Sequence, residues 1–116
     1  MYKMRSEAGM RFKISNWNKF FDGSNKVTTL RLKQSKMGHH KAYAGSYYHP
    51  DLLGEFDIIG VCITRYYALT ERDAVYDGFK TLEELKTELR NINGQIEENT
   101  ILYQHWITDV ERVKLE

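Results

Sequence analysis

Three side chains that could take part in catalysis follow one another closely: Lys26, Thr29 and Arg31. A threonine hydroxyl attacks a carbonyl only after a base has taken its proton, and a lysine amine can be that base when burial or a neighbouring cation lowers its pKa. Because side chains alternate along a strand, Thr29 and Arg31 share one face, and Lys26 joins them only if the chain bends between Asn25 and Val27. The preceding Gly-Ser-Asn favours that bend. The alternative is a surface strand with ordinary solvated charges.

The elements around these residues are short. Residues 27–33 are rich in β-branched side chains and predict a strand, and residues 10–14 alternate apolar and basic residues as a shorter strand would. Between them we expect a helix over residues 15–22, capped by Ser15 and carrying its aromatic residues on one side. Gly23 stands where a helix commonly ends in the left-handed conformation.

Residues 34–54 show no clear periodicity and predict a long connection. Cations bind phosphates and aromatic rings stack on bases, so this segment suits a nucleotide or single-stranded nucleic acid. The competing interpretation is a flexible loop whose tyrosines pack onto the fold. A metal site is not expected, because the histidines His39, His40 and His49 lack metal-ligand spacing. The candidate nucleic-acid or substrate-binding residues of this region, added to Arg31, are Lys33, Lys36, Lys41, Tyr43, Tyr47 and Tyr48.

Two helices and a strand follow in the second half of the chain. Thr70 with Asp73, and Thr81 with Glu84, have the spacing of helix capping boxes. Residues 101–114 alternate as a last long strand. Strands predominate, so the sequence predicts an α+β fold, a small mixed β-barrel with short helices packed at its side.

Residues 56–67 are the most apolar segment and predict a central strand with both faces at least partly covered. Cys62 lies within it, and we expect a core residue rather than a nucleophile. As the chain's single cysteine it cannot form an internal disulfide, which favours a reducing, cytoplasmic setting. No apolar run has the length of a membrane span.

Length and charge indicate the organisation of the chain and its class of partner. The 116 residues predict one domain over residues 12–116, preceded by an arm or strand extension over residues 1–11. The net charge is only +1, but residues 1–50 carry ten Lys and Arg against two acidic residues, while residues 51–116 carry seven against fourteen. Such a split suggests a basic face that attracts a phosphate-bearing partner.

The pattern resembles the ASCH family, small β-barrels of the PUA-like group. The shared features are a glycine followed by Lys26, Thr29 and Arg31, the apolar strand, Asp77-Gly78-Phe79 before a helix, and a closing strand. The resemblance implies a cleft that binds RNA or a modified nucleoside, without a cofactor. Threonine at position 29 is similar to the branch with the bacterial N4-acetylcytidine amidohydrolase, whose proposed catalytic set is Lys, Thr and Glu. Carried over, these roles fall on Lys26, Thr29 and Asp77. The Asp77 side chain is shorter by one methylene than the glutamate of the family.

Three hypotheses follow. The first is an RNA- or nucleoside-binding domain. The second is a hydrolase at the same cleft, acting on N4-acylcytidine or on RNA, with a histidine of the 39–40 pair as a further candidate for RNA cleavage. The third is a protein-interaction or dimerisation module without chemistry, whose tyrosine-rich segment would contact another protein. Oligomeric state does not follow from the sequence.

Overall fold

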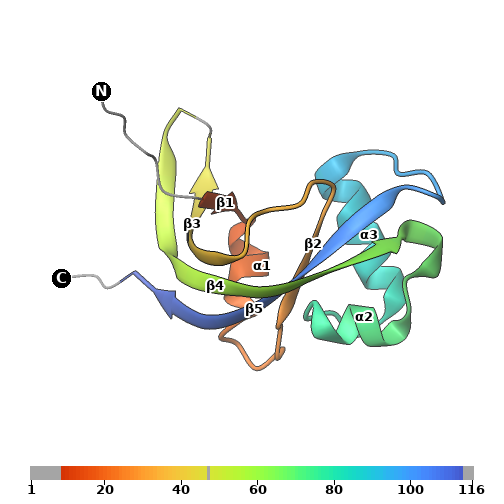
Figure 1. The fold of residues 1–116 in the computed structure, drawn as a ribbon, viewed down its shortest axis with the longest axis horizontal. Helices are drawn as coiled ribbons and strands as arrows, with labels where there is room; N and C mark the ends of the chain where they lie inside the picture. The colour runs from red at the N-terminus through yellow and green to blue at the C-terminus, as the bar shows by residue number, and fades with distance from the viewer. Residues whose placement is uncertain (1–8, 47, 114–116) are drawn as a thin grey trace.

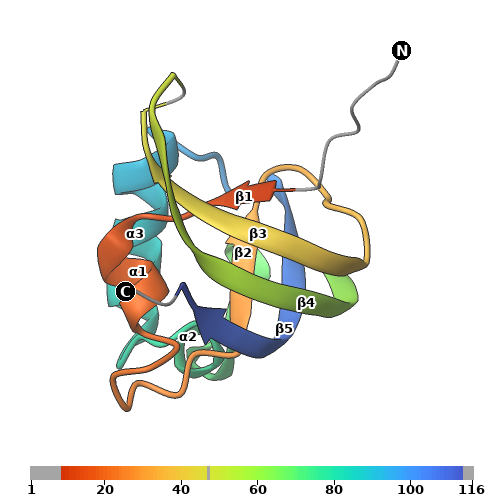
Figure 2. The same cartoon turned by 90° about the vertical axis from the view of Figure 1, so that its left-hand side faces the viewer.

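The computed structural model describes residues 9–46 and 48–113. Its strands form a single sheet in the order β1-β3-β4-β5-β2, in which β1 and β3 are parallel and the other neighbours are antiparallel. The sheet curls into a half-barrel, with β1 and β2 as its edges (Figures 1 and 2). This confirms the predicted α+β fold with a small mixed barrel. The strands are β1 Gly9–Arg11, β2 Thr28–Arg31, β3 Gly38–Gly45, β4 Pro50–Arg65 and β5 Ile101–Arg112.

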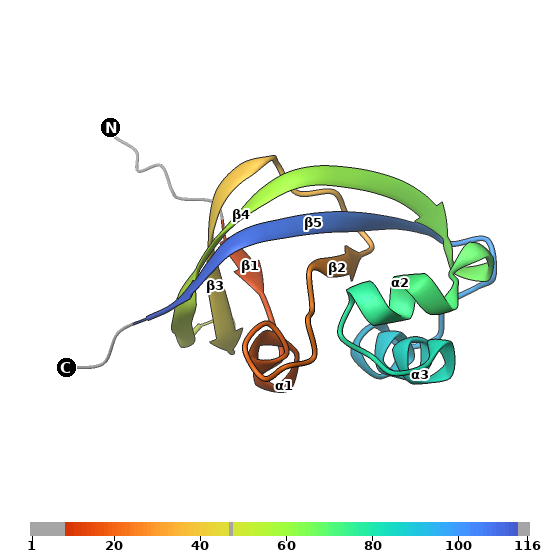
Figure 3. The ribbon, with the colours of Figure 1, turned by 90° about the horizontal axis from the view of Figure 1, so that it is seen from below.

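Short helices cover the inner side of the curled sheet. Figure 3 shows β4 and β5 arching over α1 at one end and over α2 and α3 at the other. Within the described residues, no helix combines the length and the apolar character that crossing a membrane requires. The helical elements are α1 Ile14–Asn18, a single 3-10 turn Tyr66–Ala68, α2 Glu71–Tyr76 and α3 Leu82–Asn93.

Two apolar clusters stabilise the fold. One fills the half-barrel beneath α1, and the other joins the sheet to α2 and α3. The two clusters share no residue, and residues of both line the cleft described below. The first cluster is Met10, Phe12, Trp17, Ala42, Phe56, Ile58 and Ile107. The second is Leu30, Tyr66, Leu69, Ala74, Leu85, Leu89 and Leu102.

The starts of α2 and α3 are set by the predicted caps. Thr70 Oγ1 accepts a hydrogen bond from the Asp73 backbone at 3.2 Å, and the Asp73 carboxylate accepts one from the Thr70 backbone at 2.9 Å, which completes a capping box. Thr81 caps α3 in the same way, through the backbone N–H of Glu84 at 3.1 Å. The Glu84 carboxylate, however, accepts from the Lys80 backbone at 3.1 Å, so this second box is only half formed.

The segment expected to be a long connection contains a strand instead. β3 occupies Gly38–Gly45 and forms a hairpin with β4, which begins at Pro50. His40, Ala42 and Ala44 are buried at every second position, which is strand periodicity. The prediction missed it because the buried positions are a histidine and two small alanines rather than β-branched residues.

The prediction that both faces of residues 56–67 are at least partly covered is wrong around Ile59 and Ile63. Ile59 and Ile63 are 60% and 67% exposed, and Cys62 is exposed as well, so it is not a core residue. An antiparallel sheet can leave one face in water, and the pairing of β4 with β5 is irregular between Ile58 and Gly60.

The first helix is shorter than expected. It spans only Ile14–Asn18, and Lys13 rather than Ser15 occupies the N-cap position, without a side-chain cap. Gly23 has the predicted left-handed backbone, with φ of +91°. Because the helix ends early, residues 19–27 form a turn that carries the chain into β2.

Candidate functional site

A cleft of about 660 Å³ opens between β1, β2, α1 and α3. Its lining brings together all four residues assigned by the family resemblance: Lys26, Thr29, Arg31 and Asp77. Apolar side chains of both clusters, including Phe12 and Leu89, form the rest of the wall together with polar residues of α1 and α3. The cleft therefore lies where the two clusters meet.

The predicted bend before β2 is present. Asn25 has a left-handed backbone with φ of +60°, and β2 begins only at Thr28. The Val27 N–H donates to the carbonyl of Tyr76 at 2.7 Å, which ties the bend to the end of α2. As a result Lys26 is not held to strand alternation and reaches the same cleft as Thr29.

Lys26 forms a buried ion pair with Asp77, the C-cap residue of α2. Its Nζ donates to the Asp77 carboxylate and, at 3.1 Å, to the Asp77 backbone carbonyl. The two residues are only 5% and 4% exposed. Burial lowers the pKa of Lys26 and raises the pKa of Asp77, although each charge opposes the shift of the other. The two pKa values therefore move towards each other, which eases proton transfer within the pair.

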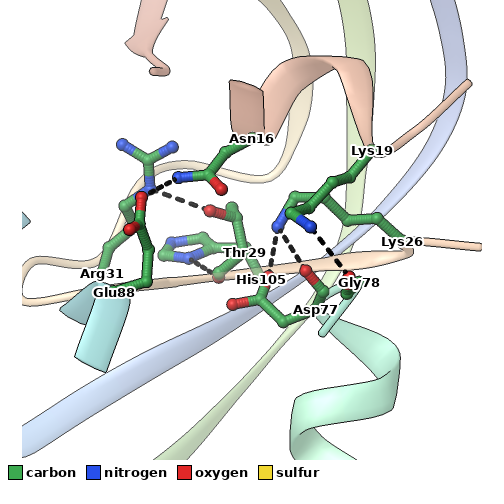
Figure 4. Close-up of polar contacts among 9 residues, drawn as sticks. All are labelled: Asn16, Lys19, Lys26, Thr29, Arg31, Asp77, Gly78, Glu88 and His105. Carbon is green, nitrogen blue, oxygen red and sulfur yellow. Dashed lines mark hydrogen bonds and ion pairs between the residues drawn. The ribbon is translucent and has the colours of Figure 1, made fainter. Parts of the chain in front are cut away.

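Arg31 holds the hydroxyl of Thr29 and also bridges the edges of the sheet. Its Nε donates to Thr29 Oγ1 at 3.1 Å, and its Nη1 donates to the carbonyl of Arg11 in β1 at 2.6 Å. The guanidinium carbon lies 4.6 Å from the centre of the Phe12 ring. Burial lowers the pKa of Arg31 to about 10, so the guanidinium remains charged at neutral pH. Figure 4 shows Thr29 between Arg31 and the Lys26–Asp77 pair.

Glu88 on α3 is a further polar group of the cleft that the sequence did not suggest. Its carboxylate accepts hydrogen bonds from Lys13 Nζ and Asn16 Nδ2, both at 2.9 Å. Figure 4 shows the contact with Asn16. Burial by itself would raise the pKa of Glu88, but the hydrogen bonds and the charge of Lys13 lower it below its usual value. Glu88 therefore stays ionised and joins α1 to α3 across the cleft. Its helical spacing gave no sign of this, since its partners are 72 and 75 residues away.

His105 supports the site from within the half-barrel. It is fully buried, and its Nε2 accepts a hydrogen bond from the Ser35 backbone at 3.0 Å. The ring proton must then be on Nδ1, which faces the carbonyl of Thr29 at 3.4 Å. Burial lowers the pKa of His105. A neutral His105 therefore fixes the backbone of Thr29 without facing the cleft.

The other predicted binding residues lie outside this cleft. Tyr43 lines a smaller hollow next to it, and Tyr47 lies outside the described residues. His39 and His40 point to opposite faces of β3, with His40 buried and His39 between Glu55 and Asp57. The remaining four residues are not among those that line the described cleft: Lys33, Lys36, Lys41 and Tyr48.

The polar groups of the cleft have complementary chemical properties. Arg31 is a fixed cation that can bind a carbonyl or phosphate oxygen. Thr29 offers a hydroxyl, and the Lys26–Asp77 pair can take up and release a proton. Nucleophilic attack on a carbonyl needs these three capacities close together.

Comparisons with known proteins identify the fold. No protein-family model and no curated protein matches the sequence. The structure is similar to the ASCH domain from Lactobacillus crispatus, with a TM-score of 0.64 and 14% identity over 91% of this chain and 80% of that chain. It is also similar to protein EF3133 from Enterococcus faecalis, of family-model DUF984, with a TM-score of 0.52 and 19% identity over 76% of this chain and 62% of that chain. The chain therefore has the fold of an ASCH domain.

Proposed function

We propose that the cleft binds RNA or a modified nucleoside and that Thr29 hydrolyses an acyl amide held there, as in N4-acylcytidine. The observation that carries this proposal is the buried Lys26–Asp77 pair in the same cleft as the Thr29 hydroxyl and the Arg31 guanidinium. The volume of about 660 Å³ also supports it, since small-molecule sites typically measure about 300–1,000 Å³.

The proposed reaction proceeds in two steps. Lys26, in its neutral form, takes the proton of the Thr29 hydroxyl, and the oxygen attacks the amide carbonyl carbon. Arg31 stabilises the negative charge that develops on the carbonyl oxygen. The protonated Lys26–Asp77 pair then returns a proton to the leaving amine, which departs as cytidine and leaves an acyl ester on Thr29. Water hydrolyses this ester and regenerates the hydroxyl.

Burial supports the protonation states that this reaction needs. A buried lysine becomes neutral more readily, and a buried aspartate becomes protonated more readily. Both shifts favour the pair of a free amine and a carboxylic acid. A purely structural ion pair needs no hydroxyl beside it, so Thr29 is the residue that distinguishes a hydrolase from a binding domain.

Incubation with N4-acetylcytidine, followed by chromatography for cytidine, tests the hydrolase directly. Thr29→Val removes the hydroxyl with little change of shape and should abolish cytidine release. Thr28→Val is the matched control, because Thr28 is fully buried and its hydroxyl has no partner among the described residues. Its activity should equal that of the unmodified protein. Turnover that survives Thr29→Val would refute the role of Thr29, and binding of the nucleoside without turnover would leave a binding domain.

The other two hypotheses have less support. No histidine is among the residues that line the described cleft, so cleavage of RNA by a histidine at this site is not favoured. A protein-interaction module requires no buried ion pair next to a hydroxyl. Incubation of the protein with a labelled RNA oligonucleotide would test the ribonuclease alternative, and intact RNA is the expected result.

A further inference from the structure

A second, smaller hollow of about 230 Å³ lies beside the cleft. It is lined by Gly9, Met10, Arg11, Tyr43 and Pro50. Arg11 also lines the cleft, so the two hollows are neighbours along β1. Gly9 and Phe12 are three residues apart on an extended chain, which corresponds to about 10 Å.

The hollow has an aromatic ring on one side, and a glycine makes room for that ring. A Cβ added to Gly9 would lie 2.9 Å from Cε2 and 3.3 Å from Cδ2 of Tyr43. One edge of the Tyr43 ring therefore lies in the space that a side chain at position 9 would occupy. Tyr43 is only partly buried, and the parallel register places it opposite Arg11. A planar stacking surface and a cation are thus found side by side.

Positive charge connects this hollow to the cleft. Arg11 Nη1 donates to the carbonyl of Gly45 at 2.5 Å, which fixes the Arg11 side chain at the boundary that the two hollows share. Arg31 lies inside the cleft, and its Nη1 donates a hydrogen bond to the backbone carbonyl of Arg11 at 2.6 Å. Single-stranded nucleic acid is bound by this combination, with cations along the phosphates and aromatic rings under the bases.

We infer that this hollow binds the nucleotide adjacent to the one in the cleft, so that the ligand is a short single-stranded RNA rather than a free nucleoside. The inference rests on the proposed function, since it assumes that a nucleoside occupies the cleft. Tyr43 stacks on the neighbouring base, and Arg11 faces the phosphate between the two nucleotides.

Affinity measurements with cytidine and with a cytidine trinucleotide test this subsite. The trinucleotide should bind more tightly, and its affinity should fall with salt while that of cytidine does not. Tyr43→Ala should weaken trinucleotide binding by about 5- to 150-fold, the worth of one stacked base, and leave cytidine binding unchanged. Gly9→Ala, which displaces the ring without removing it, should weaken trinucleotide binding in the same direction. Tyr67→Ala is the matched control, because Tyr67 is 60% exposed and lies beyond the far end of β4.

The outcomes separate the two proposals. Equal affinity for cytidine and the trinucleotide, or a trinucleotide affinity unaffected by Tyr43→Ala, would overturn the subsite while leaving the cleft proposal standing. If the unmodified protein does not bind cytidine, both the subsite and the cleft proposal are overturned. Retained cytidine binding by Tyr43→Ala and Gly9→Ala shows that these variants are folded, and a variant that loses cytidine binding as well would contradict the assignment of Tyr43 to a separate subsite.

Discussion

Removing one partner of the buried Lys26–Asp77 pair should destabilise the protein far more than removing both. The residues are 5% and 4% exposed, so water does not solvate either charge and each charge is stabilised by its partner. Asp77→Leu leaves a buried ammonium group, and Lys26→Met leaves a buried carboxyl group. Breaking a buried ion pair in this way costs about 3–5 kcal/mol in free energy of unfolding.

The double variant Lys26→Met/Asp77→Leu gives the decisive comparison. It removes both charges and replaces them with apolar side chains of similar size, a change that ranges from neutral to a stabilisation of about 4 kcal/mol. Independent effects would instead add to a loss of about 6–10 kcal/mol, which is comparable with the whole stability of a small domain. The double-mutant cycle therefore distinguishes a tightly coupled pair from two separate contributions.

Urea unfolding at neutral pH, followed by tryptophan fluorescence, measures these free energies, because Trp17 is 2% exposed and reports loss of the core. Lys13→Met is the control: the Lys13 side chain is 52% exposed in its pair with Glu88, and such a pair contributes at most about 1 kcal/mol. Single variants of Lys26 or Asp77 that lose no more than this control would refute the buried pair. An additive double variant would do the same.

Two further predictions concern the wall of the cleft and the sheet. Because the pKa of Glu88 is lowered from its usual 4.5, its contribution to stability is present above pH 4.5 and is lost as the pH falls through the lowered value. Glu88→Gln should therefore flatten the acid limb of the stability–pH curve measured by urea unfolding, and an unchanged curve would argue against the Lys13–Glu88 contact. Gly54→Ala should lower the melting temperature, since its Cβ would lie 2.0 Å from the carbonyl oxygen of Glu111, an overpacking that typically costs about 1–3 kcal/mol. Gly60→Ala, whose Cβ meets no heavy atom closer than 4.0 Å, should change it much less, and equal effects would contradict the packing at Gly54.

Features set by local interactions could be predicted from the sequence. The cap at Thr70 depends on a residue three positions away, and the bend before β2 depends on the three residues before Lys26. Thr29 and Arg31 share a face because strand alternation is a property of the backbone. These rules placed the bend that carries Lys26, the strand that carries Thr29 and the helix end that carries Asp77.

Features set by contacts between distant segments could not be predicted. Glu88 meets Lys13 only after α3 has packed near α1, and no pattern within either segment indicates the contact. β3 was missed because its inward positions are taken by His40, Ala42 and Ala44, which the curled sheet buries although strands do not favour them. The exposure of Cys62 likewise depends on which part of β4 the rest of the fold leaves uncovered.

The most direct test of the central claim is an NMR titration of the protein with N4-acetylcytidine, in which the backbone amide signals are followed. If the nucleoside binds in the cleft, the largest shifts will fall on Thr29, Arg31 and Glu88, while the exposed residue Ile63 on β4 will not respond. Shifts centred on Ile63, or no shifts at all at millimolar nucleoside, would contradict it.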